Sequence, residues 1–221
     1  MEPAVSANID VALFPIPNMV AFPGTVVPLH VFEPRYRQLV RDCVRDDRMV
    51  GVTHTKKTIR EAKRNQTAEE ALSSNQATYQ PQEIFSAGDC EIKETTADGR
   101  ILAEITMRQR LAIIDDVQTL PYRIVSCEVL QDETSSEQLP ANSDLQTLIN
   151  AKLITLMGSQ NPDLYSLLQD DSWRSLSTEE FSFKLFQFLR FDPDLMQNIL
   201  ETRSTNQRLT IVWELLSQGR L

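Results

Sequence analysis

The sequence predicts an α+β fold, in which a small and nearly closed β domain with one amphipathic helix precedes a bundle of helices. Up to about residue 130, short apolar runs alternate with polar residues and are separated by turn residues, as in β-strands. From residue 142 on, apolar residues recur with a period of about 3.6, which is typical of helices. The stretch between them, residues 131–141, is polar and acidic. We therefore expect a β domain at residues 10–132 and a helical bundle at residues 142–221.

Composition limits the kinds of partner. The chain has 221 residues, enough for one large or two small domains, and its 41% hydrophobic and 24% charged residues are ordinary for a globular protein. The net charge of −9 disfavours nucleic acid, whose phosphates attract clustered lysine and arginine. We interpret the one basic run, residues 56–64, as a solvated insertion and not as a nucleic-acid patch, because it offers no aromatic residue for base stacking.

The sequence also predicts a cytoplasmic protein that does not enter a membrane. It has no run of roughly eighteen apolar residues, the length that a transmembrane helix needs. Residues 1–10 lack the basic and apolar regions of a secretory signal. The three cysteines, Cys43, Cys90 and Cys127, are scattered without C-x-x-C spacing, which is typical of buried thiols in a reducing compartment.

Residues 13–36 organise the β domain. They combine apolar side chains with five prolines and one glycine, so they are neither a helix interior nor a solvated loop. Pro23-Gly24 is a turn dipeptide, and a strand at residues 26–32 follows, placed at an edge or a bulge because Pro28 cannot donate to a ladder. A helix then begins with Glu33 at the cap and Pro34 at the first position. Its apolar stripe consists of Tyr36, Leu39, Val40, Cys43 and Val44.

Further strands are predicted in the rest of the β domain. Residues 49–53 form a short apolar run, and residues 55–82 form a polar insertion between two strands, part of it helical at residues 67–72. The dipeptide Asp98-Gly99 between two alternating runs indicates a hairpin. Two more strands are expected, near residues 111–114 and 122–130, which makes about six strands in all.

The last third predicts four helices. Capping boxes at Ser143 and Ser177 open two of them, and the dipeptide Asp192-Pro193 opens a third. Leu209, Val212, Trp213 and Leu216 form the stripe of the fourth. Phenylalanines at residues 181–188 fall on more than one helical face, so they either fill the core or leave an exposed apolar patch; we favour the core.

Residues 20–36 match the pattern V-x-FPG-x-x-x-PL-x-VFE-x-RY, and in this they resemble the N-terminal substrate-binding domain of Lon proteases. Residues 189–201 resemble the pattern L-x-x-x-P-x-L-x-Q-x-I-L-E of standalone bacterial Lon-domain proteins. Gly88, the Asp98-Gly99 turn, Arg110 and Tyr122 also fall where that family has comparable residues, whereas Met107 occupies a place that the family often gives to glycine. The resemblance implies a PUA-like pseudo-barrel that binds unfolded or extended polypeptide, or a protein partner.

The chemistry of an enzyme is not evident in the sequence. The six glycines are isolated, so they form no phosphate loop, and Ser182 and Lys184 lie two apart on a helix, facing different sides. His30 and His54 are the only histidines, and we interpret His30 as structural. The sequence thus predicts no catalytic residue, no metal site and no cofactor. The alternative is a nucleic-acid-binding or enzymatic module, since a PUA-like scaffold does not fix function.

Residues 13–36 contain the candidate peptide-binding site. Pro23 and Pro28 interrupt backbone pairing near Phe22 and Phe32, which is what strand addition with side-chain pockets needs. At the start of the helix, polar groups suited to the rim of such a site come from Glu33 and Tyr36. The other interpretation is that Phe22 and Phe32 simply fill the core of the β domain.

Overall fold

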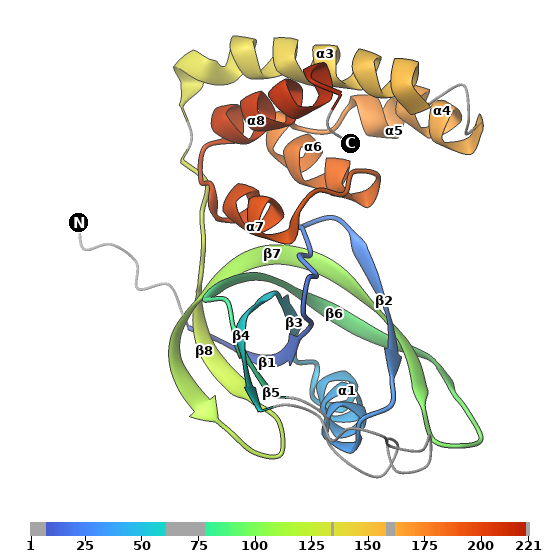
Figure 1. The fold of residues 1–221 in the computed structure, drawn as a ribbon, viewed down its shortest axis with the longest axis vertical. Coiled ribbons are helices and arrows are strands. Elements are labelled where there is room, and N and C mark those ends of the chain that lie inside the picture. The colour runs from blue at the N-terminus through green and yellow to red at the C-terminus, as the bar shows by residue number, and fades with distance from the viewer. Residues whose placement is uncertain (1–7, 61–77, 134, 158–161, 220–221) are drawn as a thin grey trace. The chain divides into compact units, whose positions relative to one another are not determined.

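The computed structural model describes residues 8–60, 78–133, 135–157 and 162–219. The chain forms two compact units, Met1–Leu130 and Gln131–Leu221, the first rich in strands and the second helical (Figure 1). The α+β fold class is therefore confirmed. Among the described residues, no helix is both long and apolar enough to span a bilayer.

The first unit is a six-stranded sheet that closes on itself. Its strands are β1 (Ile9–Pro15), β2 (Val26–Val31), β3 (Val50–Thr53), β6 (Ile84–Thr95), β7 (Ile101–Gln118) and β8 (Ile124–Val129). They are ordered β2-β7-β6-β3-β1-β8, and β7 also pairs with β8. That extra pairing completes a ring of five strands, to which β2 adds on the outside of β7. Only β1 and β3 pair in parallel.

Strand β7 is long enough to pair with different strands along its two halves. Its first half pairs with β2 and β6, and its second half pairs with β8, so the strand curves across the unit (Figure 1). The prediction of a separate strand near residues 111–114 is therefore wrong, because those residues belong to β7. Register shifts next to Gly88 and Ile113 provide the bends.

Two apolar clusters hold this unit together. One contains only strand residues of the ring: Val11, Leu13, Phe85, Ala87, Leu111, Val125 and Cys127. The other joins the opposite side of the sheet to helix α1 (Pro34–Asp46), through Tyr36, Leu39, Val40 and Cys43 of the predicted stripe. Glu33 is the N-cap residue of α1 and Pro34 its first residue, as the sequence predicts. The helix thus covers one face of the sheet and carries the chain from β2 to β3.

The two ends of the polar insertion pair with each other. Strands β4 (Thr55–Arg60) and β5 (Thr78–Pro81) form an antiparallel ribbon outside the six-stranded sheet. The sequence did not indicate this pairing, because neither segment has a clear alternation of apolar residues. The helix predicted at residues 67–72 lies outside the described residues.

The second unit consists of short helices around one long helix. They are η1 (Ser136–Gln138), α3 (Leu139–Met157), α4 (Pro162–Gln169), α5 (Asp171–Arg174), α6 (Thr178–Lys184), η2 (Leu185–Gln187), α7 (Pro193–Glu201) and α8 (Thr205–Ser217). The capping box at Ser177 and the cap at Asp192 are confirmed. The box predicted at Ser143 is wrong, since α3 already begins at Leu139. Three of the phenylalanines belong to the core, as favoured above: Phe181, Phe183 and Phe186.

Candidate functional site

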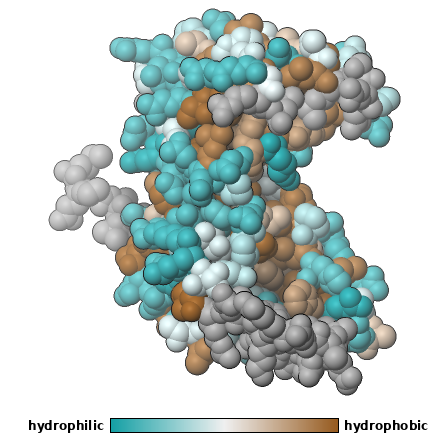
Figure 2. Space-filling view, in the orientation of Figure 1, coloured by the Kyte–Doolittle hydropathy of each residue, from teal (hydrophilic) through white to brown (hydrophobic). Residues whose placement is uncertain are grey.

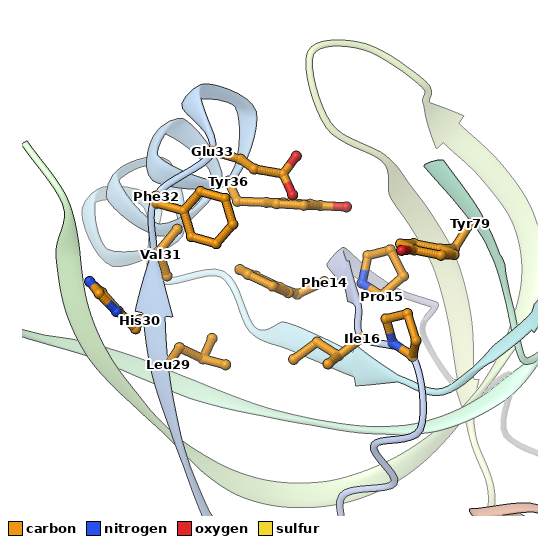
Figure 3. A pocket seen from close by; sticks show the side chains of 11 residues that line it. Phe14, Pro15, Ile16, Leu29, His30, Val31, Phe32, Glu33, Tyr36 and Tyr79 are labelled. Carbon is orange, nitrogen blue, oxygen red and sulfur yellow. The ribbon is translucent and has the colours of Figure 1, made fainter. Parts of the chain in front are cut away.

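A cavity of about 350 Å³ opens between the end of β1, the end of β2, the start of α1 and the ribbon strand β5 (Figure 3). Figure 2, in the orientation of Figure 1, shows hydrophobic residues gathered in the middle of the β unit, with hydrophilic residues on either side. The cavity is lined by Phe14, Pro15, Ile16, Pro17, Leu29, His30, Val31, Phe32, Glu33, Tyr36 and Tyr79. A mostly apolar, concave site with a few polar groups at its edge is the usual form of a ligand-binding site.

Aromatic rings form the wall between β1 and α1. The rings of Phe14 and Tyr36 are stacked, with centroids 4.3 Å apart and planes at 22°. Phe32 lies beside Tyr36 and Ile16 lies below Phe14, so that apolar side chains from three segments face the same space (Figure 3). Phe32 is 38% exposed, which leaves its ring accessible to a partner. This wall provides contact area for apolar side chains that come from outside.

The segment that follows β1 is held in place by its backbone. The Ile16 amide donates to the Thr53 carbonyl at 2.9 Å, and the Asn18 amide donates to Nδ1 of His54 at 3.0 Å. His54 is buried, so it acts here as a structural acceptor. The floor of the cavity is therefore fixed by the neighbouring strand β3 and the residue after it.

An ion pair marks the rim. Oxygen Oε2 of Glu33 lies 3.0 Å from both Nε and Nη2 of Arg35, and the two side chains are 13% and 12% exposed. The guanidinium of Arg35 lies 4.6 Å from the centroid of the Tyr36 ring, and its Nη1 donates to Oγ1 of Thr78 at 3.3 Å. Polar groups thus border one end of the cavity while the rest is apolar.

The Tyr36 hydroxyl points into the cavity in Figure 3. Burial raises the pKa of Tyr36 to about 12, because the phenolate would lose its hydration. The hydroxyl therefore keeps its proton near neutral pH and can donate a hydrogen bond to a carbonyl of a ligand.

Strand β2 contributes an open edge. Among the described strands it stands at one end of the sheet order, and β7 is its one partner there. Proline has no amide hydrogen, so Pro28 fits a position whose N–H would point away from β7. His30 lines the cavity although its side chain points away from it in Figure 3, so its backbone borders the cavity. The open edge thus offers backbone carbonyls, including that of Pro28, but no donor at Pro28, and it lies beside a cavity for side chains.

The structure brings three of the five predicted site residues to this cavity, namely Phe32, Glu33 and Tyr36. Phe22 and Pro23 do not line it. Phe22 is 1% exposed, and its carbonyl accepts from the amide and the hydroxyl of Thr25, so its ring fills the interior. The cavity thus lies at the end of β2 beside Phe32, Glu33 and Tyr36, and the peptide-binding role of Phe22 and Pro23 stays a prediction.

Sequence reasoning missed the contributions of β1 and β5. The run Phe14-Pro15-Ile16-Pro17 alternates apolar side chains with prolines, and proline, which cannot donate to a ladder, is typical of the end or the edge of a strand. Tyr79 is the one aromatic residue of the polar insertion at residues 55–82. That difference from its neighbours could have indicated that it belongs to a binding site.

The other candidate groups are occupied by structural contacts. In the described part of the chain, no three His, Cys, Asp or Glu residues are grouped so as to hold a metal ion. The Ser182 hydroxyl donates to the Glu179 carbonyl and accepts from Nε of Arg208. Burial raises the pKa of the thiols of Cys43 and Cys127 to about 12, which suppresses the reactive thiolate.

The family model for the substrate-binding domain of ATP-dependent protease La (LON) matches residues 10–218 of this chain. The chain belongs to this family. The resemblance of residues 20–36 to the Lon N-terminal domain is thus confirmed over almost the whole chain, including the helical unit.

Curated relatives include Lon protease 1 of Herpetosiphon aurantiacus, 22% identical over 216 residues, and Lon protease 2 of Myxococcus xanthus, 25% identical over 213 residues. These alignments cover 95% and 94% of this chain but only 24% and 23% of the relatives. The chain therefore spans about a quarter of the length of the Lon proteases that it matches.

Solved structures of Lon N-terminal domains share the fold. The N-terminal domain of the Mycobacterium avium complex Lon protease has a TM-score of 0.67 at 12% identity, covering 94% of this chain and 98% of that one. A Lon N-terminal domain protein from Xanthomonas campestris has a TM-score of 0.54 at 19% identity, covering 93% and 97%. The arrangement of a partly closed sheet followed by helices is thus common to the family.

Proposed function

We propose that this chain is a non-enzymatic recognition module that binds unfolded or extended polypeptide, with apolar side chains of the client in the cavity between β1, β2 and α1. The observation that supports it best is the meeting of an apolar cavity of about 350 Å³ with the open edge of β2. An extended client uses both features, because its backbone pairs with the edge while alternate side chains enter the cavity. The family's description as a substrate-binding domain agrees with this proposal.

The expected affinity is modest. A client phenylalanine that enters the cavity buries roughly 150–250 Å², which at about 25 cal/mol per Å² favours binding by several kcal/mol. Ordering a flexible client opposes this gain. We therefore expect weak and reversible binding, in about the micromolar range. Such binding suits a module that must release its client.

The absence of enzymatic activity is part of the proposal. The isolated glycines provide no phosphate loop, and Ser182 is engaged by Glu179 and Arg208. A cytoplasmic location also remains a prediction, which the buried free thiols of Cys43 and Cys127 support. Purified protein incubated with ATP or unfolded casein is expected to turn over neither.

Fluorescence anisotropy tests the binding proposal with a labelled polar peptide that carries two phenylalanines two residues apart. Phe32→Ala removes an exposed ring of the cavity, and we expect about tenfold weaker binding, as for loss of one aromatic contact. Leu120→Ala is the matched control, since Leu120 is 80% exposed and does not line the cavity. Equal affinity of wild type and Phe32→Ala, or a loss of the same size in Leu120→Ala, contradicts the proposal.

A further inference from the structure

Arg35 occupies a position that does not favour a cation. It is the second residue of α1, where the partial positive charge of the helix N-terminus favours carboxylates. The side chain is also 12% exposed, so it has lost most of its hydration. Helix stability therefore does not explain an arginine at this position, and its contacts must.

Those contacts join three parts of the cavity wall. Nε and Nη2 hold the Glu33 carboxylate at the rim, and the guanidinium plane lies over the ring of Tyr36. The remaining nitrogen, Nη1, donates to the Thr78 hydroxyl on β5. Only a planar group with several donors makes these contacts at once; a lysine ammonium retains the charge but not the geometry.

The contact with Thr78 links helix α1 to the ribbon of β4 and β5. Strands β4 and β5 form a ribbon outside the six-stranded sheet. Below the cavity, the Gln82 amide donates to the His54 carbonyl, which anchors one end of the ribbon. Tyr79, next to Thr78, forms the cavity wall that faces Tyr36 (Figure 3). The bond from Arg35 to Thr78 therefore directly links the parts of the chain that carry these two walls.

We propose that Arg35 is a positioning residue. It holds the side of the cavity formed by Tyr79, the Tyr79 wall, close to the opposite side formed by Tyr36, and so makes the cavity prefer bulky side chains. The proposal rests on the proposed function and adds a determinant of its specificity. With the Tyr79 wall in place, a bulky side chain touches aromatic rings on both sides. With the wall released, it touches one side only and loses its advantage over a small side chain.

The test compares the affinities of two labelled peptides, the phenylalanine peptide above and the same peptide with alanine at both positions. In Arg35→Lys we expect the preference for the phenylalanine peptide to fall by about two- to tenfold, the contribution of one aromatic contact. Tyr79→Ala should lower it by a similar factor, and the double variant should lower it no further. Arg108→Lys is the control, because Arg108 pairs with Asp89 at an exposed site.

A second readout needs no peptide. The chain has four tyrosines, so fluorotyrosine labelling gives four fluorine resonances, and Tyr79→Phe assigns the one of Tyr79. We expect that resonance to shift in Arg35→Lys and to stay unchanged in Arg108→Lys. An unchanged peptide preference in Arg35→Lys, or losses that add in the double variant, overturns the proposal. If the wild-type protein binds neither peptide, the proposed function fails instead, and the fluorine resonance alone decides whether Arg35 positions Tyr79.

Discussion

At the scale of single residues, the helical unit depends on one buried arginine. Arg208 on α8 is fully buried, and its guanidinium donates to Asp132 at 3.0 Å, to the Thr202 carbonyl at 2.9 Å and to Ser182 at 3.0 Å. It also lies 4.1 Å from the centroid of the Phe183 ring. Asp132 is 3% exposed. A buried charge of this kind is tolerated only while its partners remain.

Asp132→Ala should lower the free energy of unfolding by about 3–5 kcal/mol, because it leaves the Arg208 charge buried without its carboxylate. Urea denaturation followed by circular dichroism measures this loss. Asp46→Ala is the control, since Asp46 pairs with Arg45 in solvent, and it should change the midpoint little. A loss in Asp132→Ala that is no larger than in the control would show that the pair does not support the fold.

The residues of the cavity show what sequence can foresee at this scale. The positions of Phe32, Glu33 and Tyr36 beside one another follow from a strand that ends where a helix begins. Phe14 and Tyr79 join them only because β1 pairs with β3 and because the insertion folds back as a ribbon. Those pairings join segments with no local pattern that matches one to the other, so the wall that they form could not be predicted.

At the scale of elements, the contact between β6 and β7 requires a glycine. A Cβ at position 88 would lie 1.9 Å from the Thr106 carbonyl oxygen and 2.7 Å from Cα of Met107, both of them backbone atoms that cannot rotate away. The register shifts by one residue at this position. Gly88 thus allows the close approach of the two strands at their bend.

Gly88→Ala should destabilise the β unit by about 1–3 kcal/mol, the cost of forcing extra volume into a packed contact. Thermal denaturation followed by the β signal of circular dichroism measures it. Gly219→Ala, at a position with no atom within 4 Å, is the control and should cost only its local backbone strain. Equal melting temperatures of Gly88→Ala and wild type would mean that the strands separate locally at no cost.

The sequence predicted whether a segment is a helix or a strand better than it predicted the residues at which that segment begins and ends. The side chains of Ser177 and Asp192 identify helix starts because they accept hydrogen bonds from free backbone amides. The prolines after Glu33 and Asp192 identify them because proline lacks the amide hydrogen that would have no partner at the first position. The start of α3 could not be placed in this way, since the 3-10 turn η1 leads directly into Leu139, which is 58% exposed. The length of β7 was missed for a similar reason, because its two halves are stabilised by different partner strands.

At the scale of the whole molecule, stability should fall as pH rises from 9 to 12. Burial raises the pKa of the Cys43 and Cys127 thiols from 9.0 to about 12 and that of Tyr36 from 10.0 to about 12. The unfolded chain therefore loses these protons first, so it is favoured progressively over this range, while below pH 9 the contribution is fully present.

Urea midpoints measured across this pH range test the prediction. Cys127→Ala should reduce the slope, because it removes one of the buried acids. A midpoint that stays constant up to pH 12 would contradict it.

The division into a β domain at residues 10–132 and a helical bundle at residues 142–221 also remains a prediction. Because Asp132 pairs with Arg208, a helical fragment that begins at residue 131 should unfold at higher urea than one that begins at residue 142, the boundary expected from sequence. Replacement of Arg208 by methionine should recover part of that difference in the shorter fragment, since it removes the unpaired charge. Fragments of equal stability would show that the pair is dispensable.

Strand β1 pairs with β3 on one side and with β8 on the other, so the first strand of the chain and one of the last in the β unit are neighbours. During synthesis, residues 9–15 leave the ribosome long before residues 124–129 exist. The apolar ring cluster, which includes Val11 and Val125, is therefore incomplete for most of that time. A nascent chain therefore exposes an incomplete barrel until residues 124–129 have been translated, and exposed apolar surface of this kind favours aggregation during that interval.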